Sequence, residues 1–416
     1  MVLHLSTFHL EGGAGVAAAR LHRALLKSGV DSHLLVQFPT ASEAQVGAWD
    51  GTGKWANRRA WTRFAAERLA FYPNEKDASV RFAFSPAKIG VNLTSHPLVQ
   101  QASVIHLHWV NFGYLSLDSL KSLFSLGKPV VWTLHDMWTF TGGCHYNRGC
   151  DHYLSHCSFC PFLARPARYD ISFDQFEFKK QIYQDANLTL LSPSHWLDQN
   201  VKVAPLTEAL PSLSIPNCID TTLFKPLDKT IVRQQLNLPI NKKLVLFTGA
   251  NTQDPRKGFS YFKKAFELIG YRDDVEVLVL GKANNQAFEN FPVTVHYLGK
   301  IDTQEKMVAA YNAANVLVAP SLEDNLPNTI MEAMACGVPV AGFRTGGIPE
   351  MIDHLHNGYV CEARSSESLA AGIMWVLENN HQGLLSLNAR EKVLSAYSEA
   401  VVARQHSELY YALLHG

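Results

Sequence analysis

The sequence predicts an α/β protein built from two doubly wound domains, each with a parallel sheet. Short apolar, β-favouring runs alternate with helical patterns along nearly the whole chain, as expected for repeated βαβ units. The chain has 416 residues, more than one domain usually contains, and 47% of them are hydrophobic, which is enough for two large cores. Polar residues gather where the apolar runs end, at the sheet edge where such folds bind ligands.

The charge balance and the apolar pattern argue against several classes of protein. Lys and Arg together number 37, as do Asp and Glu, so no overall positive field attracts nucleic acid. No run of 18 apolar residues is present, and we expect no transmembrane helix. The N-terminal stretch lacks the features of a signal peptide, so we expect a cytoplasmic protein. In that compartment the seven cysteines are expected to be reduced and not a disulfide set.

A glycine-rich turn follows the first predicted strand, 2–6. It contains Gly12, Gly13 and Gly15, and a helix is expected from about 16 to 27. Glycines at a strand-to-helix turn let the backbone approach a phosphate or a sugar closely. The other strands predicted for this domain are 31–37, 104–108, 129–134 and 189–192.

Residues 54–72 form a basic and aromatic segment, with five basic residues and one acid. Its apolar side chains fall at helical spacing on one side: Trp61, Phe64, Ala65, Leu69 and Tyr72. Two interpretations stay open. The helix lies in the headgroup region of an anionic membrane, or it packs its aromatic stripe on its own domain.

The strand at 129–134 delivers His135 to its C-terminal end, where parallel sheets bind ligands. Histidine can exchange protons near neutral pH, which favours a functional role. The alternative is a histidine that only satisfies hydrogen bonds at a strand end.

Four cysteines crowd the seventeen residues that follow soon after: Cys144, Cys150, Cys157 and Cys160. Four thiolates in one loop can close a tetrahedral structural zinc site, although this spacing is not a common zinc-finger pattern. The alternatives are reduced thiols, or disulfides under oxidising conditions. The loop, 142–161, follows His135 and is expected to shape the acceptor side of the site.

The second half of the chain alternates strands and helices. Strands are predicted at 243–248, 275–280, 293–298 and 316–319, and helices at 259–269 and 303–313. The loop after the first of these strands ends in Arg256-Lys257-Gly258. Two cations between a strand and a helix N-terminus favour phosphate binding, and two solvated loop cations are the alternative.

The most informative stretch runs from 316 to 352. After its strand come an acidic turn, a helix expected at 329–336 with Asn328 as N-cap, a strand at 338–343 and a Gly346-Gly347 turn. Seven residues separate Asp324 in the turn from Glu332 in the helix. Carboxylates accept hydrogen bonds from sugar and ribose hydroxyls, and the helix N-terminus beside the glycine turn favours phosphate. Together these features suit a nucleotide-sugar.

At these residues the sequence resembles a known family. Residues 332–340, EAMACGVPV, are similar to the donor-site motif of the retaining GT-B glycosyltransferases of family 4, which build bacterial polysaccharides. That family carries two glutamates with seven residues between them; here Asp324 takes the first place, with Glu323 one residue earlier. Residues 215–220, IPNCID, resemble the family's interdomain hinge, and the loop with four cysteines resembles that of the colanic-acid, exopolysaccharide branch.

The resemblance implies a GT-B fold, two Rossmann-like domains that face each other across a cleft. We expect an acceptor-side domain over 1–215, a nucleotide-sugar domain over 216–395, and a helix over 396–416 that crosses back to the first domain. The implied reaction moves a sugar from a UDP- or GDP-sugar to a hydroxyl of a glycan or lipid-linked glycan, with retention and without a metal. A nucleotide-sugar epimerase or hydrolase, or a silent binding module, are the alternatives.

The resemblance also assigns roles to residues. Lys257 is expected to bind the diphosphate, together with backbone N–H groups near Gly12, Gly13, Gly15, Gly346 and Gly347. The family often has an arginine just after the strand, and this chain does not. Either Arg256 takes its place, or the site has one positive charge fewer. Glu332 is expected to hold the ribose. The donor sugar is expected beside His135 and on a loop formed by Asp324, Asn325, Leu326 and Pro327.

Overall fold

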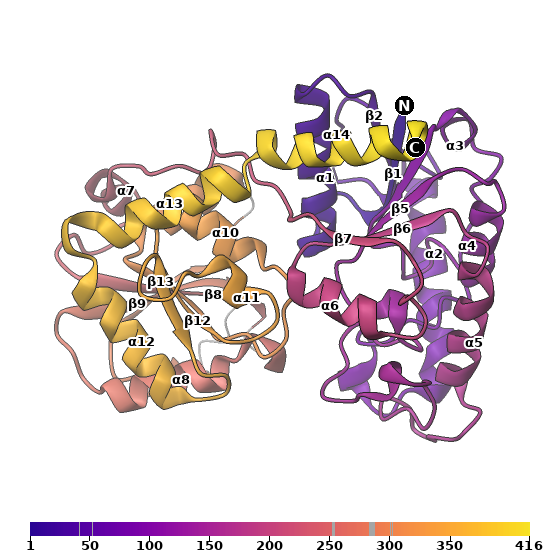
Figure 1. Ribbon diagram of the computed structural model, residues 1–416. Coiled ribbons are helices and arrows are strands. Elements are labelled where there is room, and N and C mark those ends of the chain that lie inside the picture. Colours follow the sequence, from indigo (N-terminus) through magenta and orange to yellow (C-terminus); the bar gives the residue numbers. More distant parts are fainter. Residues whose placement is uncertain (41, 52, 252–253, 283–287, 300, 302) are drawn as a thin grey trace. The chain divides into compact units, whose positions relative to one another are not determined.

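The computed structural model describes residues 1–416 except 41, 52, 252–253, 283–287, 300 and 302. The chain divides into two compact units (Figure 1). The first comprises Met1–Cys218 and Val402–Gly416, and the second comprises Ile219–Val401. The first border lies within the predicted hinge, and each unit contains one parallel sheet covered by helices.

The sheet of the first unit has the order β3-β2-β1-β4-β5-β6-β7, with every pair parallel. Its central strands are buried on both faces, which explains their continuous apolar runs. The strands are β1 Val2–Phe8, β2 Ser32–Phe38, β3 Val46–Ala48, β4 Val104–Leu107, β5 Val130–Thr133, β6 Leu188–Ser192 and β7 Ser212–Ser214.

The helices of this unit connect successive strands, as right-handed crossovers require. They are α1 Gly12–Lys27, α2 Lys54–Phe71, α3 Pro97–Gln101, α4 Leu117–Phe124, α5 Ile171–Tyr183 and α6 His195–Val203, with short 3-10 turns η1 Tyr72–Asn74, η2 Ala78–Val80, η3 Trp138–Phe140 and η4 His152–Leu154. The last helix, α14 Glu399–His415, adds Val402, Ala403 and Tyr410 to a core cluster that contains Val2, Val104 and Val131 of the sheet. The end of the chain is therefore part of the first core.

Helix α2 packs with a face that differs from the predicted one. Its buried residues are Ala56, Ala60, Glu67, Arg68 and Phe71. The predicted stripe is largely in solvent, with Trp61 57%, Leu69 68% and Tyr72 61% exposed. The stripe therefore packs on its own domain only in part: the rings of Trp61 and Phe64 contact Phe38 of β2, whereas most of Leu69 and Tyr72 stays in solvent. The physical reason is that the buried carboxylate of Glu67 accepts hydrogen bonds from the backbone N–H groups of Ala87 and Ile89. These bonds set the rotation of the helix about its own axis, so that the face with Glu67 points inward.

The sheet of the second unit has the order β10-β9-β8-β11-β12-β13, again all parallel. Its strands are β8 Lys243–Asn251, β9 Val275–Lys282, β10 Val295–Gly299, β11 Val316–Ala319, β12 Val340–Phe343 and β13 Gly358–Cys361. Its helices are α7 Lys229–Gln235, α8 Phe259–Ile269, α9 Gln304–Ala313, α10 Asn328–Ala335, α11 Ile348–Met351, α12 Ser366–Asn379 and α13 Leu384–Ala396, with 3-10 turns η5 Pro255–Lys257 and η7 His381–Gly383. Helices cover both faces of the sheet (Figure 1).

Two predicted helix starts differ from the structure. Helix α1 begins at Gly12, so the predicted glycine loop is its first turn, and Glu11 is the N-cap. Helix α10 begins at Asn328, and Pro327 is its N-cap without a side-chain hydrogen bond. Asn328 is therefore not the cap, because it is already helical. Pro327, with φ of −66° and ψ of 120°, is the extended residue that precedes the helix. In the part of the chain that the structure describes, no helix has the length and apolarity needed to cross a membrane.

Candidate active site

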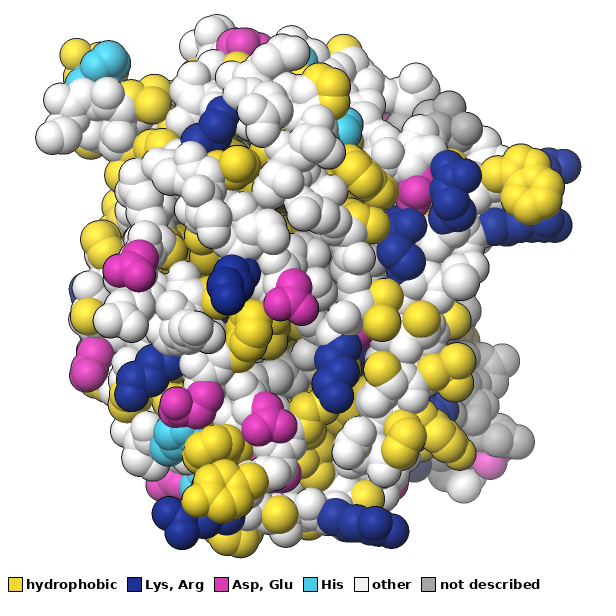
Figure 2. Space-filling model, turned by 90° about the vertical axis from the view of Figure 1, so that its right-hand side faces the viewer, with side chains coloured by type: hydrophobic (Ala, Val, Ile, Leu, Met, Phe, Trp, Pro, Cys, Tyr) yellow, Lys and Arg dark blue, Asp and Glu magenta, His cyan; other side chains and the backbone are white. Residues whose placement is uncertain are grey.

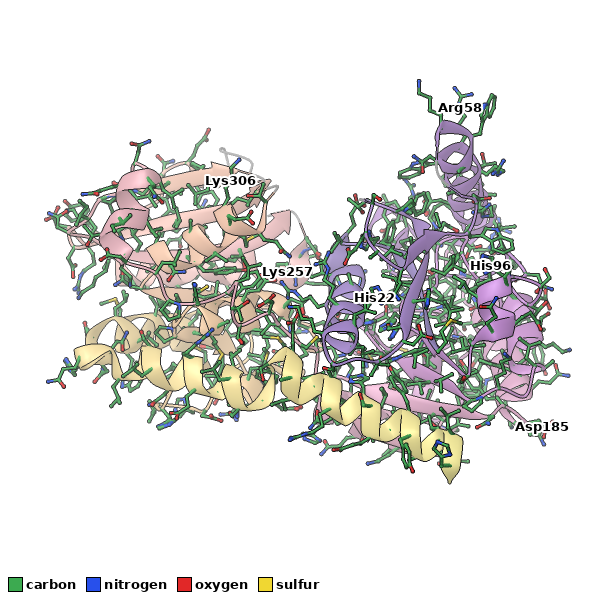
Figure 3. The ribbon with its side chains drawn as sticks, turned by 90° about the horizontal axis from the view of Figure 1, so that it is seen from above. His22, Arg58, His96, Asp185, Lys257 and Lys306 are labelled. Carbon is green, nitrogen blue, oxygen red and sulfur yellow. The ribbon has the colours of Figure 1, made fainter. Side chains whose placement is uncertain are left out.

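Two residues that the sequence assigns to different parts of a donor lie in contact. The ammonium of Lys257 lies 2.7 Å from Oδ2 of Asp324. Lys257 ends η5, which follows β8, and Asp324 lies in the loop after β11. Because β8 and β11 are parallel neighbours, their C-terminal loops meet at one sheet edge. The two side chains are 34% and 15% exposed, so a ligand can reach them (Lys257 is labelled in Figure 3).

Backbone packing fixes this contact. Gly258 has φ of +67°, and a Cβ there would lie 1.9 Å from the carbonyl oxygen of Pro320. The N–H of Leu322 donates to the carbonyl of Arg256 at 2.7 Å. The loop with the lysine and the loop with the aspartate are therefore docked on each other, and only glycine fits at position 258.

The Gly346-Gly347 turn packs against the loop that contains Asp324. Gly346 has φ of +56°, and a Cβ there would lie 1.7 Å from the carbonyl oxygen of Asp324. The N–H of Gly347 donates to the carbonyl of Asn325 at 2.9 Å. In the structure this turn holds the 324–325 backbone, and its contact with a donor phosphate stays a prediction.

Arg256 has a different partner from Lys257. Its guanidinium donates to both carboxylate oxygens of Asp254, at 3.2 and 2.8 Å. Burial alone would raise the pKa of Asp254, but the hydrogen bonds and charge of Arg256 outweigh it and lower that pKa. Of the two predicted phosphate cations, Lys257 is the one held beside Asp324.

Glu332 projects from α10 and is nearly buried, with 8% of the residue exposed. The hydroxyl of Tyr311 donates to its Oε2 at 2.7 Å. The loop before the helix is anchored by Leu326, whose side chain packs in the core beside Ile330 and Met331. The predicted role of Leu326 in donor binding can therefore involve its backbone, since its side chain is 6% exposed.

In the first unit, a chain of hydrogen-bonded imidazoles reaches His135. Nδ1 of His108 lies 3.2 Å from Nε2 of His135, and Nε2 of His108 lies 3.0 Å from Nδ1 of His4. These residues come from or just beyond the neighbouring strands β1, β4 and β5. Burial lowers the pKa of His135 to about 4 and holds the pKa values of His4 and His108 well below 6.5, so all three are neutral at pH 7.

A fourth histidine, His106, stacks on this chain. Its ring lies 4.5 Å from that of His108, and its nitrogens bond to the hydroxyls of Tyr410 and Thr133 at 2.6 and 2.7 Å. Within the described residues, His4, His106 and His108 are the group of three ligand-type side chains whose atoms lie within 4.8 Å of one another. Because both nitrogens of His106 are already bonded, we interpret the group as a hydrogen-bonded stack and not as a metal site.

Sequence reasoning missed the imidazole chain. Its signal is His106 in one strand, His108 two residues later at the end of that strand, and His4 in another strand. Residues two apart on a strand share a face, and β1 pairs with β4 in the register His4 to His106. The pattern alone does not show that those strands are neighbours.

Asp136 connects the end of β5 to the loop with four cysteines. It accepts hydrogen bonds from Trp109 Nε1 at 2.8 Å, from the Trp138 N–H at 2.9 Å and from His145 Nδ1 at 2.6 Å. Burial alone would raise the pKa of Asp136, but the charge and hydrogen bond of His145 outweigh it and lower that pKa. The residue after His135 is thus firmly placed.

The remaining predicted residues are three glycines near the start of α1 and the four loop cysteines. Gly15 is required for packing, because a Cβ there would lie 2.9 Å from the carbonyl oxygen of Phe8, whereas a Cβ on Gly12 would meet open space. Gly12 and Gly13 lie in the first turn of α1, and their contact with a donor stays a prediction. All four loop cysteines line one cavity, and none is in a disulfide.

Two family models match different parts of the chain. The model described as Glycosyltransferase Family 4 matches residues 11–175, and the model described as Glycosyl transferases group 1 matches residues 242–379. WcaC of Escherichia coli K12, named as a colanic acid biosynthesis glycosyl transferase, is 25% identical over 361 residues, which cover 84% of this chain and 85% of that protein. N-acetyl-alpha-D-glucosaminyl L-malate synthase of Bacillus anthracis is 26% identical over 210 residues, 48% of this chain and 54% of that protein.

Solved structures show the same architecture. Sucrose-phosphate synthase from Thermosynechococcus elongatus matches with a TM-score of 0.68 at 19% identity, over 99% of this chain and 98% of that one. HepE of Anabaena, solved in complex with UDP-glucose, matches with a TM-score of 0.63 at 14% identity, over 99% of both chains. At these identities the likeness concerns the fold, which is the GT-B fold of two parallel-sheet α/β domains.

Proposed function

We infer from these matches that the chain is a member of the GT-B glycosyltransferase superfamily, and we propose that it transfers a sugar from a nucleotide-sugar to an acceptor hydroxyl with retention. The observation that carries the proposal is the contact of Lys257 with Asp324 at one sheet edge, 2.7 Å apart. A cation and a hydroxyl acceptor side by side match the two parts of a nucleotide-sugar that flank the breaking bond. The complex of HepE with UDP-glucose supports a nucleoside diphosphate sugar as donor.

Lys257 is proposed to neutralise the departing diphosphate, so that no metal is needed. The glycosidic bond breaks with negative charge growing on the phosphate oxygen, and a fixed ammonium stabilises that charge more in the transition state than before it. Asp324 holds the ammonium in place through their ion pair. Once the donor is bound, the carboxylate of Asp324 is proposed to accept hydrogen bonds from the donor sugar.

Glu332 is proposed to bind the ribose hydroxyls. Its Oε2 already accepts the Tyr311 hydroxyl, which orients the carboxylate. In the first unit, His135 is proposed to position the reacting sugar as a neutral imidazole, since the pKa of about 4 keeps it uncharged at pH 7. The hydrogen bond with His108 fixes its ring.

The acceptor is proposed to be a growing or lipid-linked polysaccharide, supported by the match to WcaC. A surface for a membrane is proposed on α2, and we name Trp55, Arg58, Trp61, Leu69 and Tyr72 the α2 patch. Its four apolar residues are more than half exposed. Arg58 lies at the tip of the helix in Figure 3, and Figure 2 shows basic and hydrophobic side chains projecting together at one edge.

The charge of this segment is smaller than its composition suggests. Arg59 and Arg63 both pair with Asp50, at 3.1 Å for the first, and Arg68 is buried beside Glu67. Lys54 and Arg58 are left to meet anionic lipid. Attachment through the α2 patch is therefore proposed to depend more on apolar insertion than on charge.

A donor screen followed by transfer assays tests the proposal. Thermal shift with UDP- and GDP-sugars identifies the donor, because a ligand that binds the native state raises Tm. Glu332→Ala should weaken binding of that donor more than it slows transfer. Donor turnover without any acceptor would favour an epimerase or hydrolase, and binding without turnover would favour a silent module; either result overturns the proposed transferase.

A further inference from the structure

The four loop cysteines surround one small cavity, which the proposed sugar transfer does not use. They come from different parts of an irregular loop that contains one 3-10 turn, η4. The cavity is also lined by Phe84, Tyr153 and Phe162, and its volume is about 20 Å³. That space holds a single water or ion and no metabolite.

Backbone donors point at two of these sulfurs. The N–H of Gly142 donates to Sγ of Cys157 at 3.1 Å, and the backbone of Phe162 hydrogen-bonds to the sulfur of Cys160. Such hydrogen bonds favour the thiolate over the thiol. Gly142 is also required sterically, because a Cβ there would lie 2.5 Å from the carbonyl oxygen of Ser172 and 2.7 Å from Cβ of Cys157.

A buried cation lies beside the same group of sulfurs. Lys179 of α5 is fully buried, and its ammonium donates to the carbonyl oxygens of Trp138 and of Thr141, the latter at 3.0 Å. Both partners are neutral. The acidic groups near enough to act on it are Cys157, Cys144 and Asp136, of which the two thiols are uncharged as long as they carry their protons. Burial lowers the pKa of Lys179 to about 7, so Asp136 does not fully compensate the ammonium, and thiolates beside it would raise that pKa.

We propose that Cys144, Cys150, Cys157 and Cys160 bind one structural Zn²⁺ as thiolates. Each thiol loses its proton, so one ion displaces four protons to solvent, and no group is oxidised or reduced. The resulting site carries a net charge of −2, which compensates Lys179. Within the described residues the four sulfurs do not form a group of ligand atoms as close as that of His4, His106 and His108, so binding requires the loop to contract around the ion.

Such an ion would pin the loop beside the end of β5. Gly143 accepts a backbone hydrogen bond from Ser85, and His145 of the same loop bonds to Asp136. Asp136 in turn follows His135. Zinc would therefore stabilise the wall next to His135 without touching the reacting groups, which is a structural role.

Metal analysis of the full chain tests the site. Protein purified without chelators in the presence of zinc should carry about one equivalent of Zn²⁺. Cys157→Ser and Cys160→Ser should each reduce this at least tenfold, whereas Cys361→Ala, a buried cysteine in the second unit, should retain it. Replacement by Co²⁺ should give the visible absorption of a tetrahedral thiolate site.

Three results would overturn the site. They are less than a tenth of an equivalent of zinc in the unmodified chain, an equivalent of another metal in its place, and a disulfide between loop cysteines found by mass spectrometry after alkylation. If the serine variants do not fold, removal of zinc from the unmodified chain by a chelator remains as a test. It should lower Tm, and adding Zn²⁺ back should restore it. None of these measurements depends on sugar transfer.

Discussion

The ammonium of Lys257 lies 2.7 Å from the carboxylate of Asp324, and each residue comes from the loop at the end of a neighbouring parallel strand. The pair links a cation suited to phosphate with an acceptor suited to sugar hydroxyls. An ion pair that is partly exposed contributes little to stability, about 0–1 kcal/mol. Its arrangement therefore matters for the ligand more than for the fold, and changes to it should leave a folded protein.

Lys257→Ala should lower kcat by about 10²-fold or more, the scale seen when a preorganised charge that stabilises a transition state is lost. The measurement is initial transfer rate with the identified donor at saturation. Lys306→Ala removes an exposed lysine of the same unit and should keep full activity (both lysines are labelled in Figure 3). Full activity of Lys257→Ala would show that the active site is elsewhere.

Asp324→Ala should impair transfer more than Glu323→Ala. Asp324 holds Lys257, and seven residues lie between it and Glu332, as between the two acids of the family motif. KM and kcat measured for both variants decide between the two acids. A larger loss in Glu323→Ala would move the sugar-binding role to that neighbour.

Gly346→Ala should reduce donor affinity at least tenfold, because a Cβ 1.7 Å from the Asp324 carbonyl forces the 324–325 backbone to move. Gly383→Ala is the matched control: it has a left-handed backbone with φ of +74°, but a Cβ there meets open space. The control should lose about 1–2 kcal/mol of stability from strain alone and keep its donor affinity. Isothermal titration with the donor compares the two, and equal affinities would contradict the role of Gly346.

The first unit should lose stability in acid. His406 and His135 have pKa values of about 4 in the folded chain, below the value of about 6.5 expected when unfolded. Between these values the unfolded chain binds more protons, so stability is fully present above pH 6.5 and falls as pH drops toward 4. Each group contributes up to about 1.4 kcal/mol per pH unit in this window.

Urea unfolding followed from pH 7 to pH 4.5 measures this dependence. His406→Gln should weaken the slope by about one proton, since the buried imidazole is gone. His381→Gln, at an exposed position, should leave the slope as it is. A pH-independent stability of the unmodified chain would contradict the buried, neutral histidines.

Trp61→Ser with Leu69→Ser should reduce binding to vesicles that contain phosphatidylglycerol by about tenfold, because two exposed apolar side chains of the α2 patch are lost. Arg58→Glu should reduce binding at low salt only. Leu387→Ser, which removes a 65% exposed residue of the second unit, serves as control and should bind normally. Vesicle sedimentation at two salt concentrations is the measurement. Unchanged binding of the double variant would contradict the proposal that the α2 patch binds a membrane.

The sequence by itself determined the fold class, and most residues of the proposed donor site could be named from it. Apolar runs in βαβ order follow from the burial of parallel strands on both faces, and strand-end loops are local in sequence. Lys257, Asp324 and Glu332 could be proposed because each lies in a short pattern of strand, loop and helix. Their neighbours Tyr311 and Asp254 could not be predicted as hydrogen-bond partners, since no sequence pattern indicates a single hydrogen bond.

Only the tertiary structure decided what depends on strand order and on burial. The chain of His4, His108 and His135 exists because β1, β4 and β5 are neighbours, although His4 and His135 are far apart in sequence. The face of α2 was decided by a buried Glu67 with backbone partners, against the aromatic periodicity. Periodicity reports average burial, whereas a hydrogen bond between distant segments is specific to one packing, which only the folded chain selects.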